Sequence, residues 1–217
     1  MAGKHALLTG ATGMVGGQVL RHLLDAPEIS RITVLTRRPT GVVHPNAAKM
    51  TEVIHMDYED YSSVRAHLEG VDMCFFCIGV YTGKVSPSEY RRLTATVPIA
   101  CGRALRESSP RATFILLSSE RADQTQRSRK AFRKYKGEAE AGLLSLGLDS
   151  MHFFRPGMII PAIKRKAPTT AYAITDTLLV PRHDHTSHQA QGPHHSLCHH
   201  RHTPSAHTQA DMDRRSG

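Results

Sequence analysis

Three glycines near the start of the chain, Gly10, Gly13 and Gly16, follow one another at intervals of three residues. The apolar segment 5–9 before them has the composition of a strand, and the segment 18–24 after them has helical spacing. A strand, a glycine-rich turn and a helix in this order form a cradle for a dinucleotide. Gly10 permits the tight turn, Gly13 lets the backbone approach a pyrophosphate, and Gly16 lets the helix pack closely. The backbone groups that we assign to this cradle belong to Gly10, Thr12, Gly13, Met14, Val15 and Gly16.

The next strand-like segment, 31–36, ends in Arg37 and Arg38. This is the place where an NAD-binding domain carries an acidic residue for a ribose hydroxyl. A guanidinium fork suits the 2′-phosphate of NADP, whereas an acid there would repel it. The arginine pair therefore favours NADP(H) over NAD(H). The alternative is that both arginines are solvated surface residues.

Strand-like and helix-like segments alternate along most of the chain. The predicted strands are 5–9, 31–36, 51–56, 72–78, 112–117 and 150–154, and the predicted helices are 15–25, 61–69, 87–107 and 130–146. This alternation predicts an α/β fold, a Rossmann-type doubly wound parallel sheet with helices on both faces. Pro98 predicts a kink or break within 87–107, and Gly147 predicts the end of the last helix.

Ligands of such a sheet bind beyond the carboxyl ends of the strands. Asp57 follows the third strand and is placed to accept a hydrogen bond from an adenine amino group, or alternatively to cap a turn. The fourth strand ends in Cys77, Ile78 and Gly79, where a small residue lets the adenosine ribose approach. Cys74 and Cys77 form a C-x-x-C, but residues three apart on a strand face opposite ways. We interpret both cysteines as small core residues rather than as a redox pair, and predict no metal site there.

The chain has 217 residues, 40% of them hydrophobic, and a formal net charge of +9, which suits one α/β domain. No apolar run approaches the ~20 residues of a membrane helix, so we expect no transmembrane segment. Because the first strand begins near the start, we expect no signal peptide and a cytoplasmic location. Much of the positive charge lies in one arginine-rich segment and in the tail. Without a nucleic-acid-binding motif, it does not indicate a nucleic-acid partner.

The periodic pattern fades near residue 165. We therefore divide the chain into a dinucleotide-binding domain, 1–165, and a tail, 166–217. Within 183–207, nine of 25 residues are histidine, and such a tail buries too little apolar surface to order itself. One interpretation is a tail that binds zinc or nickel. The other is a segment without selected function, such as the product of a shifted reading frame, which the irregular histidine spacing favours.

Several ordered motifs resemble those of the atypical short-chain dehydrogenase/reductases, in particular the branch of the HIV Tat-interacting oxidoreductase-like proteins. The matching segments are 9–16, 36–38, 77–79, 116–119, 136–140 and 154–157. The resemblance implies a Rossmann domain that binds NADPH, followed by a small C-terminal substrate lobe. It also implies a catalytic Tyr-x-x-x-Lys pair with a nearby serine. In such a site the tyrosine exchanges a proton with the substrate oxygen, the lysine lowers the tyrosine pKa and holds the nicotinamide ribose, and the serine positions the oxygen.

The chain departs from this pattern at the tyrosine. Lys136 stands in the matching context, but Phe132 occupies the position four residues earlier. Tyr135 is adjacent to Lys136, and neighbouring helical side chains point about 100° apart, so Tyr135 replaces the missing hydroxyl only if the helix starts late or is distorted. Ser119, or Ser118, remains as a hydrogen-bond donor. The candidate catalytic residues are therefore Ser119, Lys136 and Tyr135, with Lys136 also binding the cofactor.

A second departure follows Arg155, where the substrate lobe is truncated or replaced by the histidine-rich tail. The resemblance implies that Arg155 lies near the nicotinamide and helps to bind the cofactor, and the alternative is a salt-bridging framework residue. Missing lobe elements would leave the sheet edge bare. Between Ser119 and Lys136 lie the basic residues Arg121, Arg127, Arg129, Lys130, Arg133 and Lys134. They form either a lid that favours an acidic substrate or, more simply, a solvated loop.

Three functions remain open at this point. The first is an NADPH-dependent oxidoreductase that reduces a small carbonyl compound, with a water or Tyr135 delivering the proton. The second is a non-catalytic NADP(H)-binding regulator or protein-interaction module, which the phenylalanine at position 132 favours. The third is a chain without function, because its lobe is truncated. The sequence identifies neither a substrate nor a protein partner.

Overall fold

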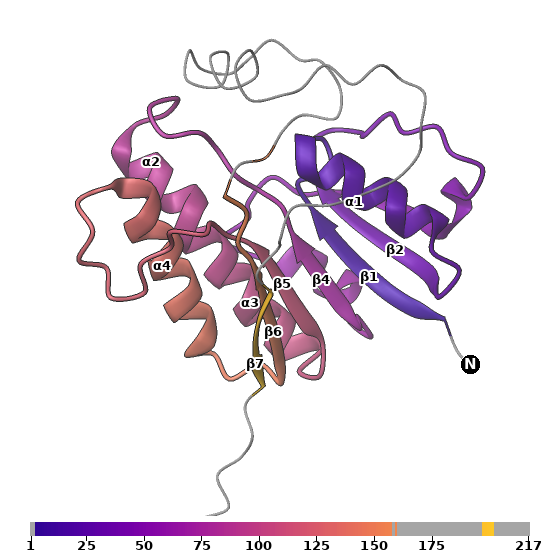
Figure 1. The fold of residues 1–217 in the computed structure, drawn as a ribbon. Helices are drawn as coiled ribbons and strands as arrows, with labels where there is room; N and C mark the ends of the chain where they lie inside the picture. Colours follow the sequence, from indigo (N-terminus) through magenta and orange to yellow (C-terminus); the bar gives the residue numbers. More distant parts are fainter. Residues whose placement is uncertain (1–2, 158, 160–196, 202–217) are drawn as a thin grey trace, which may run out of the picture.

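The computed structural model of the protein describes residues 3–157, 159 and 197–201. Seven strands form one sheet in the order β3-β2-β1-β4-β5-β6-β7, with helices against both of its faces (Figure 1). The first six strands run parallel to one another. The chain builds the sheet outward from β1 in one direction and from β4 in the other, so the crevice between the two halves opens beyond the ends of β1 and β4. The predicted doubly wound Rossmann-type fold is confirmed.

The structure has all six predicted strands, each within two residues of its expected bounds. They are β1 (Lys4–Thr9), β2 (Ile29–Thr36), β3 (Met50–Ile54), β4 (Met73–Phe76), β5 (Thr113–Leu117) and β6 (Ser150–Phe154). The α-helices are α1 (Met14–Asp25), α2 (Pro87–Arg91), α3 (Val97–Ser108) and α4 (Ala131–Leu144). Shorter 3₁₀ segments lie at Ala47–Lys49 and Ser62–His67.

Two predicted helices differ from expectation. The segment 61–69 forms a 3₁₀ helix over Ser62–His67 instead of an α-helix. The segment 87–107 is divided by a π-helical turn at Arg92–Thr96, and the break thus precedes Pro98. Pro98 itself lies in the first turn of α3, directly after the π-helical turn. α4 ends at Leu144, and Gly147, at φ 67°, donates its N–H to the Leu144 carbonyl oxygen just beyond the helix.

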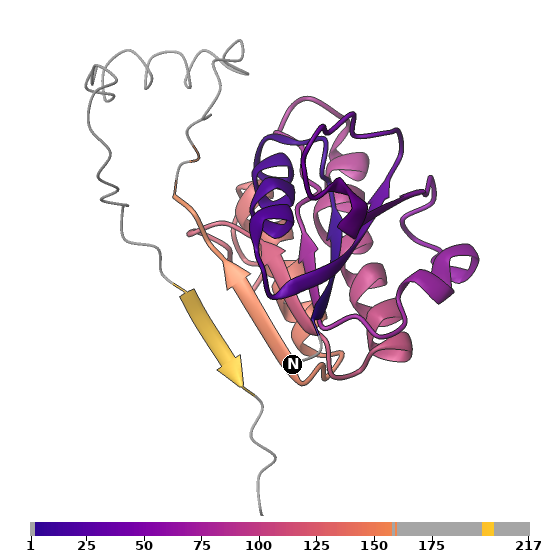
Figure 2. The ribbon, with the colours of Figure 1, turned by 90° about the vertical axis from the view of Figure 1, so that its right-hand side faces the viewer.

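Apolar side chains form a separate core on each face of the sheet. The core beneath α1 includes Leu8, Leu24 and Val34, and the core beneath α3 and α4 includes Leu7 and Phe114. Figure 2 shows α1 and α3 on opposite sides of the sheet. Successive residues of β1 therefore enter different cores, as the pleat requires.

The two cysteines of the C-x-x-C motif lie on opposite faces of the sheet. Cys74 is fully buried in the α3 and α4 core, while Cys77 packs against the α1 core. Both are free thiols. The interpretation of the pair as core residues that cannot bridge is thus supported by their placement.

The strand β7 (Leu197–Arg201) pairs antiparallel with β6 at the edge of the sheet (Figure 2). The expectation of a bare edge at β6 is therefore wrong. The unpaired N–H and C=O groups of an edge strand accept any extended segment within reach, and here the chain's own tail supplies it. The rest of 166–217, with both interpretations of its histidines, lies outside the described residues.

No helix in the described part of the chain is both long and apolar enough to cross a bilayer. Across residues 3–157, 159 and 197–201, histidine, cysteine, aspartate and glutamate side chains do not gather in threes as a metal ion would require.

His5 is a buried titratable group on β1, only 5% exposed. Its Nδ1 lies 3.2 Å from the Gly70 carbonyl oxygen and its Nε2 2.9 Å from Thr33 Oγ1. Since a carbonyl only accepts, Nδ1 carries the hydrogen and the Thr33 hydroxyl donates to Nε2. A neutral ring satisfies both contacts. Burial, helped by the charge of Arg31, lowers the pKa of His5 below its usual 6.5.

We expect the free energy of unfolding to fall as the pH drops below about 6.5, because the unfolded chain then takes up a proton that the buried His5 does not. Above that pH the ring is neutral in both states and the contribution is complete. Replacing His5 with glutamine should reduce the slope of the free energy of unfolding against pH by up to about 1.4 kcal/mol per pH unit. Urea unfolding from about pH 5 to pH 8 measures this slope. His22→Gln, at an exposed position of α1, should keep the wild-type slope, and an equally unchanged slope in His5→Gln would contradict the assignment.

Candidate dinucleotide-binding site

The glycine-rich turn after β1 is packed so closely that two of its positions exclude any side chain. Gly10 has φ 76°, and a Cβ there would lie 2.7 Å from the carbonyl carbon and oxygen of Cys77. A Cβ on Gly16 would lie 2.1 Å from the Gly10 carbonyl oxygen. Gly10 therefore brings the turn against the end of β4, and Gly16 lets α1 begin directly against the turn. The close packing of the helix that the sequence predicts is thus a contact between Gly16 of α1 and the Gly10 carbonyl group.

The N-terminus of α1 is open to an anion. Gly13 is the N-cap residue, no side chain caps the helix, and its first turn holds no acidic residue. The first N–H groups of a helix have no partner within it, and they carry the positive end of the helix dipole. Thr12 and Gly13 are exposed, Met14 and Val15 are half-buried, and Gly16 is buried. With no Cβ at Gly13 and no capping side chain in competition, these residues fit the diphosphate of a dinucleotide.

Arg37 and Arg38 follow β2 at the same edge of the sheet, and both are exposed. The ion pairs formed within residues 3–157 involve neither guanidinium. The Thr36 hydroxyl donates to the Arg38 carbonyl oxygen at 2.6 Å and fixes the turn. Arg37 lies near Tyr58, where its charge opposes the burial that raises the pKa of Tyr58 to about 12. Both guanidinium groups are thus available to an anion beside the α1 turn.

The remaining residues predicted for the adenosine half lie beyond β3 and β4. Asp57 is exposed, and its Oδ1 accepts a hydrogen bond from the Glu59 N–H at 3.0 Å, which is the turn-capping role. Cys77 and Ile78 are half-buried and Gly79 is exposed. The Cys77 N–H donates to the Thr9 carbonyl oxygen at 3.2 Å and extends the pairing of β4 with β1.

Lys136 points from α4 to the carboxyl ends of the central strands. Its Nζ donates to the Leu117 carbonyl oxygen at 2.6 Å, at the end of β5. Burial lowers its pKa to about 8, although the nearby groups of Glu140 and Cys77 favour the charged form. Since Cys77 also touches the Gly10 turn, Lys136 shares the sheet edge with the α1 turn.

Tyr135, the candidate catalytic residue next to Lys136, does not point the same way as the lysine. The Tyr135 ring lies against Tyr90 of α2, with ring centroids 6.1 Å apart. Phe132, one helical turn before Lys136, has the Arg133 guanidinium 5.7 Å from its ring centroid. Neighbouring helical residues diverge in this way by geometry, so the structure does not bring the Tyr135 hydroxyl and the Lys136 amine to one element.

The two serines after β5 have separate environments. The Ser118 hydroxyl is buried and donates to Glu140 Oε1 at 2.5 Å. Ser119 is half-buried and follows Leu117 by two residues. Of the pair, Ser119 is therefore the one whose hydroxyl is left for a ligand.

Glu140 is a buried residue that sequence analysis missed. Its carboxylate, 0% exposed, accepts two bonds from Arg155, at 2.9 and 2.5 Å, and one at 2.9 Å from Gln124 Nε2. With the Ser118 bond it joins α4 to the segments after β5 and β6. Arg155 therefore has the framework contact that was its alternative interpretation. An acid four residues after Lys136, on the helix face that carries buried Leu143, was the available signal.

The basic segment before α4 is anchored by one acid. The Asp123 carboxylate accepts bonds from the N–H groups of Thr125 and Ser128, at 3.0 and 2.7 Å. A Cβ on Gly137 would lie 1.8 Å from the Asp123 carbonyl oxygen, so this loop docks tightly on α4. Most of its basic side chains are exposed, and in Figure 1 the loop lies beside α4, across the molecule from α1 and β2. The segment is therefore separate from the Arg37 pair.

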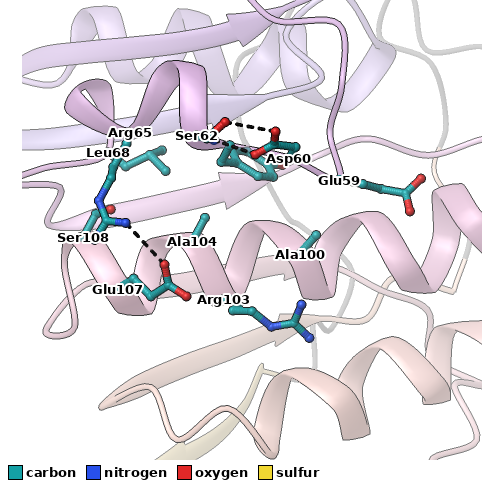
Figure 3. A pocket seen from close by; sticks show the side chains of 11 residues that line it. Glu59, Asp60, Ser62, Arg65, Leu68, Ala100, Arg103, Ala104, Glu107 and Ser108 are labelled. Carbon is teal, nitrogen blue, oxygen red and sulfur yellow. Dashed lines mark hydrogen bonds and ion pairs between the residues drawn. The ribbon is translucent and has the colours of Figure 1, made fainter.

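A cavity of about 230 Å³ lies between the 3₁₀ segment Ser62–His67 and α3 (Figure 3). Arg65 and Glu107 form an ion pair of 3.6 Å at one end of it, and Ala100 and Ala104 leave room along α3. None of the residues assigned to cofactor or catalysis lines this cavity, so it is distinct from the candidate site.

Strand order, glycine turn and open helix terminus together define a Rossmann-type dinucleotide-binding domain. A model of the family described as NAD(P)H-binding matches residues 10–182. The chain belongs to this NAD(P)H-binding family.

Curated relatives include proteins named mitochondrial fmp52. The protein of Emericella nidulans is 28% identical over 169 residues, which cover 76% of this chain and 71% of the relative. The protein of Candida albicans is 26% identical over 155 residues, which cover 70% and 66%. Their names state no activity.

Solved structures with the same fold include three reductases or dehydrogenases. The PhqB reductase domain of Penicillium fellutanum has a TM-score of 0.63 at 16% identity, covering 82% of this chain and 56% of that one. Uronate dehydrogenase of Agrobacterium tumefaciens has a TM-score of 0.52 at 22% identity, covering 68% and 59%. The carbonyl reductase Sniffer of D. melanogaster has a TM-score of 0.53 at 16% identity, covering 66% and 74%. At these identities the likeness establishes the fold.

The expectation of a cytoplasmic location is wrong, because the curated relatives are named mitochondrial. The expectation was drawn from the absence of a recognisable leader, and no residue of the folded domain supported it. A Rossmann-type core has the same physical requirements in either compartment, so its sequence carries no positive signal of location.

Proposed function

We propose that the protein is an NADP(H)-dependent oxidoreductase of the short-chain dehydrogenase/reductase type, in the Tat-interacting oxidoreductase-like branch, acting on a small carbonyl compound. The observation that carries the proposal is the uncapped N-terminus of α1 behind a side-chain-free turn, on the sheet edge that also holds Lys136. An anion site and a half-buried amine at one edge suit a dinucleotide with its reactive ring at the amine.

Each part of the cofactor has residues of matching chemistry. The turn from Gly10 to Gly16 receives the diphosphate, and the Arg37 and Arg38 guanidinium groups receive the 2′-phosphate. The ends of β3 and β4 border the adenosine, and Lys136 donates to the nicotinamide ribose. The reduced nicotinamide supplies a hydride when bound. Ser119 donates a hydrogen bond to the substrate oxygen and orients the carbonyl.

A side-by-side fluorescence titration with NADPH and NADH tests the cofactor assignment. We expect wild-type protein to bind NADPH at least about ten-fold more tightly, because charge-assisted bonds to a phosphate contribute roughly 1.5–3 kcal/mol. The double variant Arg37→Ala/Arg38→Ala should lose this preference while NADH affinity stays within about three-fold. Arg111→Ala, an exposed arginine before β5, is the matched control. Equal wild-type affinities for NADPH and NADH would contradict both the binding of the 2′-phosphate by the arginine pair and the NADP(H) assignment.

A non-catalytic NADP(H)-binding module is the second candidate, favoured by Phe132 in the place of a proton-donating tyrosine. Such a module binds NADPH yet consumes none with any aldehyde, ketone or quinone. Turnover above the buffer rate with one compound of such a panel decides for the oxidoreductase.

A further inference from the structure

We propose that the Lys136 ammonium is itself the proton donor of this site, in place of the tyrosine hydroxyl that the chain lacks. The inference rests on the proposed function and names the catalytic acid of the same reaction. The basis is the direction in which each side chain that could donate a proton near the end of β5 points.

Each described hydroxyl or phenol group considered near Lys136 is absent, turned away, already bonded or too weakly acidic. Phe132 offers no hydroxyl at the position one helical turn before the lysine. The Tyr135 ring packs on Tyr90 of α2, in a different direction from Lys136. The Ser118 hydroxyl donates its hydrogen to buried Glu140. A serine hydroxyl such as Ser119 can hold a substrate oxygen, but it is too weak an acid to replace a phenol.

The Lys136 ammonium has more N–H donors than its hydrogen bond to Leu117 uses. Its protonated Nζ carries three hydrogens and donates one of them to the Leu117 carbonyl oxygen at 2.6 Å. That bond anchors the amine at the carboxyl end of β5, two residues before Ser119. The remaining N–H bonds are available to a ribose hydroxyl and to a substrate oxygen at the same edge.

The charged and titratable groups around Lys136 poise its proton for transfer. Burial lowers the pKa of Lys136 to about 8, while Glu140 on α4 and Cys77 at the end of β4 act in the opposite direction. Arg155, from the segment after β6, donates two hydrogen bonds to the Glu140 carboxylate. The Cys77 thiol, whose pKa burial raises to about 12, keeps its own hydrogen. An acid whose pKa lies near the working pH is both protonated and able to give up its proton.

With the cofactor held by the α1 turn and Lys136, the reduced nicotinamide would supply the hydride for the new C–H bond at the carbonyl carbon, and the C=O π pair would move to oxygen. One N–H bond of Lys136 breaks as its proton forms the O–H bond. The products are the alcohol, the oxidised nicotinamide and a neutral Lys136 amine, which regains its proton from water before the next cycle.

The first test reads the lysine without any cofactor. Competitive acetylation of the whole protein from about pH 6 to pH 11, with peptide mass spectrometry, gives the pH at which each amine becomes reactive. We expect half-maximal labelling of Lys136 near pH 8, with the exposed Lys4 as an internal standard. Labelling of Lys136 only near pH 10.4, where an ordinary lysine titrates, would overturn the proposal.

The second test separates proton donation from cofactor binding. Lys136→Arg keeps a cation and hydrogen-bond donors but no transferable proton at neutral pH. We expect it to retain NADPH affinity within about five-fold and to lose turnover by about 10²–10⁴-fold. The control Lys4→Arg should keep the wild-type rate, and wild-type turnover should decline above about pH 8. Should Lys136→Arg bind NADPH poorly through misfolding, the acetylation profile of the wild-type protein still decides.

The failures of the two proposals are distinct. If neither wild-type protein nor Phe132→Tyr, which restores the phenol, turns over any carbonyl compound, the proposed oxidoreductase function fails. If wild-type protein turns over and Lys136→Arg keeps more than about a tenth of that rate, or Tyr135→Phe loses it, Lys136 is not the acid.

Discussion

Replacing Gly16 with alanine is expected to lower NADPH affinity by at least about 100-fold, that is by roughly 2.7 kcal/mol. The added Cβ would lie 2.1 Å from the Gly10 carbonyl oxygen and 2.6 Å from its carbonyl carbon. Both contacts are backbone, so no side-chain rotation relieves them. Gly10 would have to move, and Gly10 is itself pressed against Cys77. The movement would misalign the amides of the α1 terminus with the diphosphate.

Gly17→Ala is the matched control, since it adds the same methyl group one residue along α1. Its Cβ would meet only the Ala11 carbonyl oxygen, at 3.3 Å, and alanine favours the helix. We expect NADPH affinity within about three-fold of wild type. Fluorescence titration gives both affinities, and thermal unfolding reports the strain, which overpacking makes about 1–3 kcal/mol. Wild-type affinity in Gly16→Ala would show that the turn tolerates movement and that its packing does not create the binding site.

Replacing Arg155 with methionine is expected to lower the free energy of unfolding by about 3–5 kcal/mol. The change removes the charged group that is hydrogen-bonded to the Glu140 carboxylate, which is 0% exposed. The neutral donors of Ser118 and Gln124 would remain bonded to it, with the Lys136 ammonium nearby. A second change, Glu140→Gln in the same protein, should recover part of the loss, because a buried amide costs less than a buried charge.

Arg91→Met tests whether the effect depends on burial. Arg91 also pairs with a glutamate of α4, Glu138, through two nitrogens, but its own side chain is 57% exposed. Exposed pairs contribute about 1 kcal/mol or less, and we expect a loss of that size. Urea unfolding measures all the variants. Equal losses in Arg155→Met and Arg91→Met would mean that Glu140 gains no special stabilisation from its partner.

The parts of the fold that follow local rules were predictable from sequence. The parallel strands are short apolar segments rich in β-branched residues, such as the run that ends at Thr36, and burial on both faces demands such segments. The turn at Gly10 was predictable because a positive φ and a contact with neighbouring backbone both exclude a side chain. The direction of Tyr135 relative to Lys136 followed from helix geometry alone.

The parts that depend on distant partners were not predictable. Glu140 is a buried acid that makes sense only beside Arg155 and Ser118, which approach it from the ends of two other strands. The same holds for β7, because no local sequence pattern predicts its pairing with β6. The π-helical turn at Arg92–Thr96 reflects packing between α2, α3 and α4, and helical periodicity could indicate only that Pro98 disturbs the segment.

The position of β7 has a consequence for the protein during its synthesis. The parallel strands leave the ribosome in sequence and can associate as they appear, whereas residues 155–196 must still be translated before β7 follows. Until residues 197–201 have been made, the pairing of β7 with β6 cannot form. Within the described sheet, this antiparallel pair is therefore the last that synthesis can complete.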